Sequence, residues 1–159
     1  MVAHLSAHDA QPNGRKPITY VDADAALKAR IALEWGEMQA RHMHLDDGFS
    51  IIALSEGRPV GLLSVGWREL PPPLSGAVEA FVDIIEVCEG FRRRGVARTM
   101  IGMAAWRATE HGACQLRAWS SDDKLEAIPM WQALGFGLCP AATYPRGQEV
   151  HGYFAALRV

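Results

Sequence analysis

Cysteine is scarce in this sequence, and positive charge does not dominate it. The three cysteines, Cys88, Cys114 and Cys139, lie far apart and form no Cys-x-x-Cys pair. This pattern excludes a disulfide framework and a cysteine-based zinc site, and it indicates a reducing compartment. The chain has 16 Lys and Arg against 18 Asp and Glu, which gives a net charge of −2. Because nucleic-acid-binding domains are usually basic, we expect no nucleic-acid partner.

Long apolar runs are missing as well. No stretch approaches the roughly 18 apolar residues that a membrane span requires, and the N-terminal residues contain no apolar core of signal-peptide length. We therefore expect no membrane partner and a cytoplasmic location. The six histidines show neither a His-Glu-x-x-His nor a mixed Cys/His zinc spacing, so we predict no metal. Each histidine, including His42 and His44, is interpreted as a surface residue.

The composition that remains is typical of a folded domain. Hydrophobic residues make up 49% of the 159 residues and charged residues 21%, which suffices for a sizeable core in one domain. Residues 1–16 are polar and include Pro12, Asn13 and Gly14, so they predict a flexible N-terminal tail. We expect a single domain over residues 17–159.

Hydrophobic periodicity predicts a mixture of strands and helices. The expected strands are Ile18–Asp22, Phe49–Gly57, Arg58–Leu70, Ala77–Val87, Cys114–Ser120 and two more after Phe136. The expected helices are one bent or two short helices around Gly36, capped by Asp22 or Asp24, then Val96–Glu110, and a helix from a cap at Asp122 or Asp123 to Leu134. Antiparallel strands followed by β-α-β units predict an α+β or α/β sheet covered on both faces.

The segment Arg92-Arg93-Arg94-Gly95-Val96-Ala97 joins a predicted strand to a predicted helix. The N–H groups of a helix's first turn have no helical partner, and the helix dipole makes this end attractive to anions. Gly95 allows a ligand to approach the backbone, Ala97 leaves space, and the arginines add positive charge. Arginine at a helix N-terminus opposes the dipole, which disfavours a merely solvated helix end. We predict a pyrophosphate cradle.

Two motifs resemble those of the GNAT superfamily of N-acetyltransferases. IEVCEGFRRRGVA (Ile85–Ala97) is similar to the family's coenzyme A motif, whose core is Arg/Gln-x-x-Gly-x-Gly/Ala. KLEAIPMWQALGF (Lys124–Phe136) is similar to the family's helix Asn-x-x-Ala-x-x-x-Tyr-x-x-x-Gly-Phe. The order of elements also agrees, from about Ile18 to Val159. The resemblance implies an α+β, GNAT-like fold, with a central mixed seven-stranded sheet that is splayed between strands 4 and 5 and flanked by helices on both faces.

The resemblance also implies acetyl-CoA as the cosubstrate. Its pyrophosphate would bind the backbone N–H groups of Arg93 to Ala97, and its pantetheine arm would pair with the backbone of Ile85 and Val87 like an extra strand. Trp131 would pack against the pantetheine, and Lys124 stands where the family has asparagine. The implied cofactor-binding residues are Ile85, Glu86, Val87, Arg92, Arg93, Arg94, Gly95, Val96, Ala97, Lys124 and Trp131.

The expected catalytic base departs from the family pattern. In the family, a carboxylate often lies eleven residues before the first Arg/Gln of the motif, and here that position is Phe81, which cannot accept a proton. Strict alternation would place Glu86 on one face of the strand. It would place five residues together on the other face: Glu79, Phe81, Asp83, Ile85 and Val87. Asp83 is our first candidate for the base and Glu79 the second, because a carboxylate is costly to bury without a purpose. A structural carboxylate paired with a basic group is the alternative for Asp83.

The expected catalytic acid departs from it too. Trp131 stands where the family has its acid tyrosine, and an indole N–H does not release its proton near neutral pH. Tyr144 could take this role, since its segment could fold over the acceptor site, and Tyr153 is a further option. Water could also protonate the leaving thiolate.

These features predict an acetyl-CoA-dependent N-acetyltransferase that acts on a primary amine of a small molecule or a peptide by direct attack on the thioester. A cationic acceptor would be favoured by four acidic residues: Glu69, Glu79, Asp83 and Glu149. The alternative is a catalytically weak or inactive acyl-CoA-binding sensor or interaction domain, which the departures at Phe81 and Trp131 support. Dimers are common in the family, so a homodimer stays open.

Overall fold

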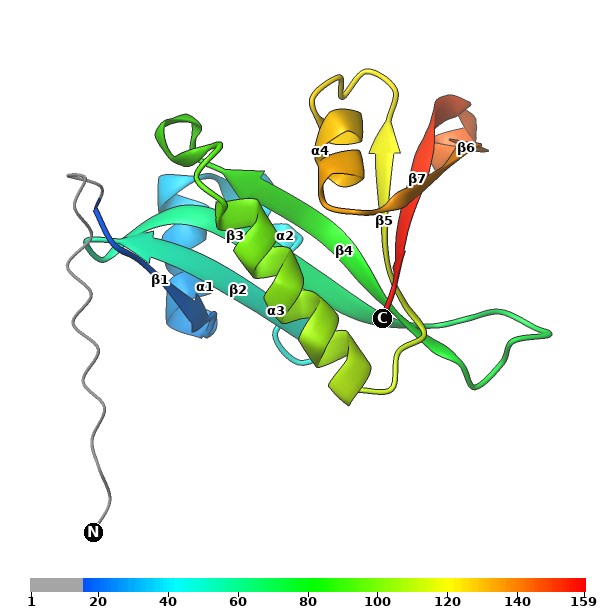
Figure 1. Cartoon of the computed structure of the whole chain (residues 1–159), viewed down its shortest axis with the longest axis horizontal. Coiled ribbons are helices and arrows are strands. Elements are labelled where there is room, and N and C mark those ends of the chain that lie inside the picture. The colour runs from blue at the N-terminus through cyan, green and yellow to red at the C-terminus, as the bar shows by residue number, and fades with distance from the viewer. Residues whose placement is uncertain (1–15) are drawn as a thin grey trace, which may run out of the picture.

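Seven strands form one mixed sheet in the order β1-β2-β3-β4-β5-β7-β6 (Figure 1). The computed structural model describes residues 16–159, so residues 1–15 of the predicted tail lie outside it. The strands are β1 (Ile18–Asp22), β2 (Gly48–Ser55), β3 (Arg58–Glu69), β4 (Val78–Val87), β5 (Gln115–Ser121), β6 (Gly137–Thr143) and β7 (Val150–Arg158). The predicted seven-stranded, GNAT-like mixed sheet is confirmed, with β4 and β5 as its parallel pair.

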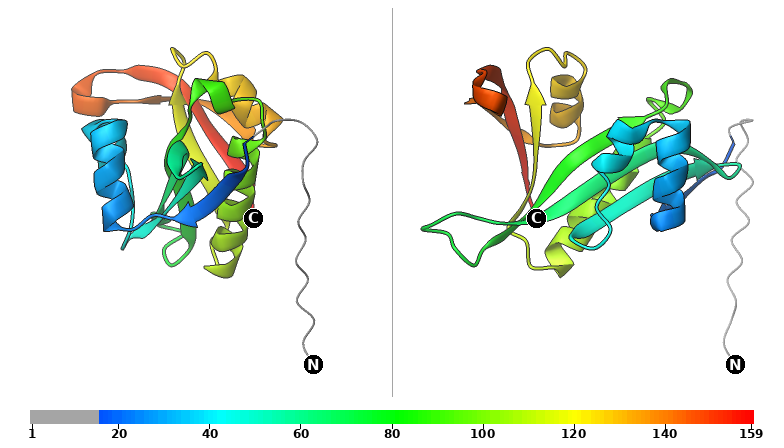
Figure 2. Two further views of the ribbon diagram at one scale, coloured as in Figure 1. Left: turned by 90° about the vertical axis from the view of Figure 1, so that its left-hand side faces the viewer. Right: turned by 180° about the vertical axis from the view of Figure 1, so that it is seen from behind.

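Four helices cover both faces of the sheet, as expected. They are α1 (Ala25–Glu34), α2 (Glu37–Arg41), α3 (Val96–Glu110) and α4 (Ala127–Ala133). Helices α1 and α2 lie on the face opposite to α3 (Figure 2), and each side has its own hydrophobic cluster. Ile31, Ile52 and Leu62 belong to the cluster under α1 and α2, whereas Met100 and Val65 belong to the larger cluster under α3.

Local sequence signals explain where the first helices begin and end. The Leu27 N–H donates to the Asp24 carboxylate at 2.8 Å, so Asp24 is the N-cap of α1. Gly36 has φ +123°, a conformation that favours glycine, and it separates α1 from α2. Two short helices therefore form instead of one bent helix.

Helix α4 is shorter than predicted. It begins at Ala127, and its N-cap residue Glu126 makes no side-chain cap. Neither expected cap acts as one: Asp123 accepts a hydrogen bond from the Ser121 hydroxyl, and the Asp122 N–H donates to the His151 carbonyl at 3.0 Å. The Lys124 N–H donates to the Ser121 carbonyl at 3.1 Å. The aspartates after β5 thus form a turn and leave the helix to start later. In the described residues, 16–159, we find no helix with the length and apolarity needed to cross a bilayer.

Strands β4 and β5 diverge after a short paired stretch. Their register contains only three pairs, Ala80↔Leu116, Phe81↔Arg117 and Val82↔Ala118, although β4 continues to Val87. The two strands open into a V, with α4 and the β6–β7 pair on the β5 side (Figure 2). The predicted splay between strands 4 and 5 is therefore confirmed, and it begins at Asp83.

A β-bulge lies at the point where β4 and β5 begin to diverge, and because of it the predicted strand faces are partly wrong. The β3–β4 register passes from Ser64↔Ile84 to Val65↔Val82, which leaves Asp83 as the extra residue of β4. An extra residue reverses the alternation beyond it. Glu79 and Phe81 therefore share a face with Ile84 and Glu86, and the prediction that they share a face with Ile85 and Val87 was wrong. In agreement, Ile84 packs in the cluster under α1 and α2, whereas Ile85 and Val87 pack in the cluster under α3.

Candidate active site

The loop before α3 presents a row of free backbone donors. Arg93 and Gly95 have φ +60° and +82°, and these left-handed residues turn the chain sharply into the helix. The Thr99 N–H donates to the Gly95 carbonyl at 2.9 Å and closes the first turn of the helix. Within residues 16–159, the N–H groups of Arg93 to Gly95 form no backbone hydrogen bond of normal geometry, and those of Val96 and Ala97 belong to the first turn of α3, where an N–H has no helical partner. A Cβ on Gly95 would meet no atom within 4 Å, so the space outside this turn is open to a ligand.

The arginine side chains brace this loop. Arg92 Nε donates to the Val87 carbonyl at 3.1 Å, and its Nη1 reaches Glu126 at 3.3 Å. The Arg94 guanidinium lies 4.7 Å from the centre of the Phe91 ring. Arg92 therefore links the end of β4 to the start of α4 across the open side of the splay. The positive charge that the sequence predicts here is present beside the free N–H groups.

Asp83 lies at the first position of β4 beyond its pairing with β5. One carboxylate oxygen accepts from Arg68 Nη2 at 2.7 Å, and the other lies 2.5 Å from His44 Nε2. The side chain is 17% exposed, so it is largely enclosed but still reachable. Through His44, this carboxylate contacts the loop that follows α2.

His44 is the residue that sequence reasoning missed. We interpreted it as a surface histidine, but its side chain is only 22% exposed and both ring nitrogens face carboxylates. Nδ1 lies 2.8 Å from Asp47 Oδ1 and Nε2 faces Asp83. The hydrogen bond with His44 holds the pKa of the Asp47 carboxyl below its usual range. Sequence spacing could suggest the His44–Asp47 contact, but not the one across 39 residues to Asp83.

Glu79, the second candidate base, is buried, and both of its carboxylate oxygens bind side chains of β5. It is 1% exposed, and one carboxylate oxygen pairs with Arg117 Nη2 at 2.9 Å. The other oxygen accepts from Gln115 Nε2 at 2.7 Å. Both partners lie on β5, so this carboxylate ties the two central strands together at their paired end.

Phe81 occupies the position of the family's carboxylate. It is 7% exposed, and the Arg68 guanidinium lies 3.5 Å from the centre of its ring. The Arg117 guanidinium lies 5.6 Å from the same ring centre. Arg68 and Arg117 also pair with Asp83 and Glu79, so each of these two carboxylates, which we expected to favour a cationic acceptor, already has a cationic partner.

Trp131, on the β5 side of the splay, belongs to the larger hydrophobic cluster that also lies under α3. It is 2% exposed, its Nε1 donates to Ser120 Oγ at 2.9 Å, and its ring lies 4.8 Å from that of Phe136. Since its single donor is engaged with β5, the indole cannot donate to another group without losing Ser120. Lys124, at the family's asparagine, is exposed and lies 3.7 Å from Asp123.

Tyr144 lies on the loop between β6 and β7. Its side chain is largely exposed, and its hydroxyl donates to Glu149 Oε1 at 3.2 Å. In the part of the chain that the structure describes, no contact joins it to Asp83. Glu69 likewise accepts from the Gly76 N–H at 3.0 Å within its own loop.

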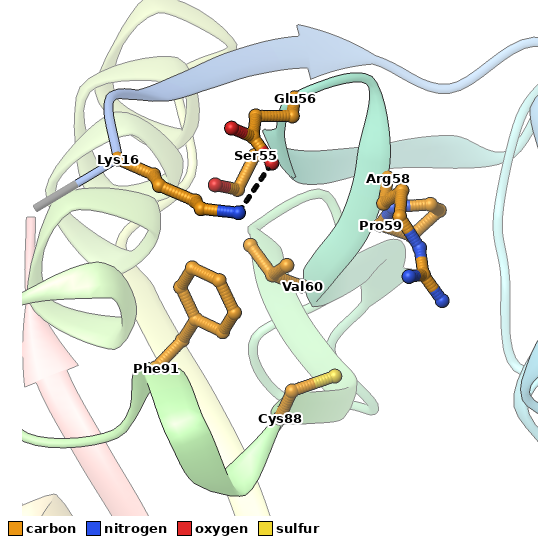
Figure 3. Close-up of a pocket in the computed structure, with 8 residues that line it drawn as sticks. All are labelled: Lys16, Ser55, Glu56, Arg58, Pro59, Val60, Cys88 and Phe91. Atoms are coloured by element: carbon orange, nitrogen blue, oxygen red, sulfur yellow. Dashed lines mark hydrogen bonds and ion pairs between the residues drawn. The ribbon is translucent and has the colours of Figure 1, made fainter.

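Cys88 follows β4 but lacks the features of a nucleophile. Burial raises the pKa of its thiol above the usual value, and nearby Glu86 adds to this effect. The residue lines a pocket of about 310 Å³ beside the β2–β3 turn, together with Phe91 and the Lys16–Glu56 ion pair (Figure 3). A raised pKa keeps the sulfur as an unreactive thiol.

The model of the acetyltransferase (GNAT) family matches residues 16–136 of the sequence. No curated protein matches it. Among solved structures, Arabidopsis thaliana NAA60 in complex with acetyl-CoA has a TM-score of 0.71 at 12% identity, over 90% of this chain and 100% of that one. A GNAT-family acetyltransferase from Streptococcus pneumoniae has a TM-score of 0.68 at 10% identity, over 90% and 100% of the two chains. A GNAT-family acetyltransferase from Elizabethkingia anophelis with acetyl-CoA bound has a TM-score of 0.63 at 14% identity, over 89% and 98%. At these identities the structural likeness concerns the fold.

Proposed function

Because the chain belongs to the GNAT family of acetyltransferases, we propose that it transfers an acetyl group from acetyl-CoA to a primary amine of a small molecule or a peptide. The observation that carries this proposal is the juxtaposition of two features. Among the described residues, the N–H groups from Arg93 to Ala97 lack backbone partners of normal geometry, and β4 next to them is left unpaired by β5 beyond Val82. The first feature suits a pyrophosphate, and the second suits an extended arm.

In the proposed complex, acetyl-CoA follows these two features. Its pyrophosphate binds the N–H groups of the loop, flanked by the arginines, and its pantetheine pairs with the backbone of Ile85 and Val87. The acetyl group then lies near Asp83, at the point where β4 and β5 diverge. A backbone N–H of β4 would there stabilise the oxyanion as the thioester carbon becomes tetrahedral.

Asp83 is the residue that we propose for proton acceptance from the amine. An alkyl ammonium has a pKa near 10, so the acceptor must lose a proton before it attacks. Asp83 lies where β4 and β5 part and keeps partial exposure. Glu79 is disfavoured, because both of its oxygens already bind β5 side chains.

Protonation of the leaving group requires no tyrosine in this proposal. A thiolate with a pKa near that of cysteine, about 8.5, can take its proton from the attacking nitrogen or from water. Trp131 contributes packing, and Tyr144 would have to leave Glu149 to reach the site. The three free thiols also support our proposal of a reducing, cytoplasmic location.

Calorimetric titration with acetyl-CoA, followed by thiol release with a panel of amines, tests the proposal. We expect binding and amine-dependent thiol release for the natural sequence. Gly95→Glu should abolish binding by placing a carboxylate where the pyrophosphate lies, whereas Gly102→Glu, on the exposed side of the same helix, should not. Binding without turnover on any amine would favour the sensor alternative, and no binding at all would exclude both functions.

A further inference from the structure

His44 is held more firmly than a loop residue normally is. Its N–H donates to Ser64 Oγ at 2.8 Å, and its carbonyl accepts from Ser50 Oγ at 2.8 Å. These two hydroxyl oxygens lie 2.9 Å apart, and both serines are buried, at 0% and 2% exposure. Since two buried residues of the sheet hold its backbone on both sides, the position of the imidazole is determined by the core.

Gly66 provides the space for the imidazole ring. A Cβ at Gly66 would lie 2.9 Å from His44 Cε1 and 3.0 Å from Nε2, which is closer than carbon atoms normally approach. Any side chain at Gly66 would therefore displace the ring from Asp83. Backbone anchoring and this gap together aim Nε2 at the carboxylate.

The two ring nitrogens have different roles. A neutral imidazole carries one N–H, an imidazolium carries two, and an ionised carboxylate only accepts. The pKa of Asp47 is held low, mainly by the hydrogen bond from His44, so Asp47 is ionised and fixes a proton on Nδ1. Nε2 is then the nitrogen that can gain or lose a proton, and it faces Asp83 at 2.5 Å. At this separation, Nε2 and the facing oxygen of Asp83 can share one proton between them.

Other charges near the pair leave this assignment intact. Arg68 on β3 donates to the second oxygen of Asp83 and orients that carboxylate. Lys28 on α1 donates to the Met43 carbonyl at 2.7 Å and further favours the ionised form of Asp47. Glu86, farther along β4, accepts from Gln39 at 3.4 Å. The imidazole thus lies between two carboxylates, each with a basic group nearby.

We propose that His44 is the proton-accepting partner of Asp83, and that the amine's proton is stored between His44 Nε2 and the Asp83 carboxylate. This inference rests on the proposed acetyltransferase function. His44 acts through Asp83, so it is a positioning and proton-storing residue and does not contact the substrate.

The acceptor ammonium gives a proton to Asp83 or, through it, to Nε2. The neutral amine then forms a bond from its nitrogen to the thioester carbonyl carbon. When the tetrahedral intermediate collapses, the carbon–sulfur bond breaks, the sulfur keeps the electron pair, and it takes the second proton of the nitrogen. The products are the amide and coenzyme A thiol, and the stored proton passes to water.

The tautomer of His44 tests the pair without any turnover. In the free protein, two-bond 1H–15N spectra at alkaline pH should show neutral His44 protonated on Nδ1, whereas exposed His42 should show the Nε2–H form usual for free histidine. Asp47→Asn should shift His44 toward the Nε2–H form. A neutral His44 that carries its proton on Nε2 in the natural sequence would overturn the proposal.

Kinetics test the use of the pair. His44→Gln should lower kcat by about 10- to 100-fold and remove the acid limb of the pH profile, with the KM for acetyl-CoA unchanged. Imidazole in the buffer should partly restore the rate of His44→Ala, and His42→Ala should behave like the natural sequence. A folded His44→Gln variant with an unaltered pH profile would contradict the proposal. If the natural sequence acetylated no amine, the proposed function would fail, and the tautomer spectra would still decide whether His44 and Asp83 form the proton-storing pair.

Discussion

Two carboxylates on β4 have different surroundings and are expected to respond differently to neutralisation. Glu79 is buried with Arg117, and removing one member of a buried pair leaves an uncompensated charge. Water screens part of this uncompensated charge, because the Arg117 side chain is 31% exposed. We therefore expect Glu79→Gln to lower the free energy of unfolding by about 2 kcal/mol, as measured by urea titration.

Asp83→Asn should instead reduce kcat by about 100-fold and leave both stability and acetyl-CoA affinity nearly unchanged. Glu34→Gln, in an exposed helical pair, is the matched control for stability and should change it by less than about 0.5 kcal/mol. Equal losses of stability in the two β4 variants would contradict this division of roles.

Cys88 gives a prediction for pH. Burial raises the pKa of its thiol in the folded chain, so the folded state binds that proton more tightly than the unfolded state. The stability that this thiol contributes is fully present at pH values below its pKa in the unfolded chain. It is lost as the pH rises through the pKa of the thiol in the folded chain. We expect Cys88 to react with a disulfide reagent at pH 8 more slowly than exposed Cys114 and Cys139, as measured on single-cysteine variants. A faster reaction at Cys88 would argue for an activated thiol.

At the scale of elements, Gly95 before α3 and Gly102 within it test the turn that we propose as the pyrophosphate site. Gly95 has φ +82° and open space around its Cβ position, whereas Gly102 lies in the exposed helix interior with equally open space. Gly95→Ala should lower the unfolding free energy by about 1 kcal/mol through its left-handed backbone, and Gly102→Ala should raise it by about 0.5–1 kcal/mol. Thermal denaturation of the two variants checks both signs, and stabilisation by Gly95→Ala would show that the loop does not need this conformation.

Element by element, the sequence predicted most of the fold and misjudged the places where local patterns are interrupted. Helix α3 has its predicted bounds because its apolar arc and His-Gly end are local signals. The strand faces were wrong beyond Asp83, because a bulge adds one residue without any mark in the alternation. Helix α4 was too long in the prediction, because Ser121 competes for the expected aspartate cap.

The candidate site shows the same limit. The turn and helix start at Arg92–Ala97, our proposed pyrophosphate site, could be predicted, because the motif, the turn and the helix start are contiguous. The Asp83–His44 contact could not, because it joins residues 39 positions apart through a loop placed by buried Ser50 and Ser64. Contacts of this kind depend on the register of the sheet.

At the scale of the whole molecule, the splay divides the sheet into two parts, which are joined at its closed end and share the larger hydrophobic cluster. Three register pairs connect β4 to β5, while Arg92–Glu126 and a bond from Arg98 to the Ala133 carbonyl at 2.9 Å connect the α3 side to α4. A ligand in the splay would add contacts to both parts. Saturating acetyl-CoA, at 100 times its Kd, should therefore raise the unfolding free energy by about 2.7 kcal/mol.

Hydrogen exchange with and without acetyl-CoA locates this stabilisation. Free N–H groups exchange fast, so residues 93–97 should gain the largest protection when a pyrophosphate accepts their hydrogen bonds. The amides of residues 83–87 that point into the splay should be protected as well, because the pantetheine would pair with them as an added strand. Amides of β2, already paired on both sides by β1 and β3, serve as the internal control and should change little. Protection confined to residues 93–97 would mean that the pyrophosphate binds while the arm stays outside the splay, which would remove Asp83 and His44 from the reacting carbon and require a different route for the proton.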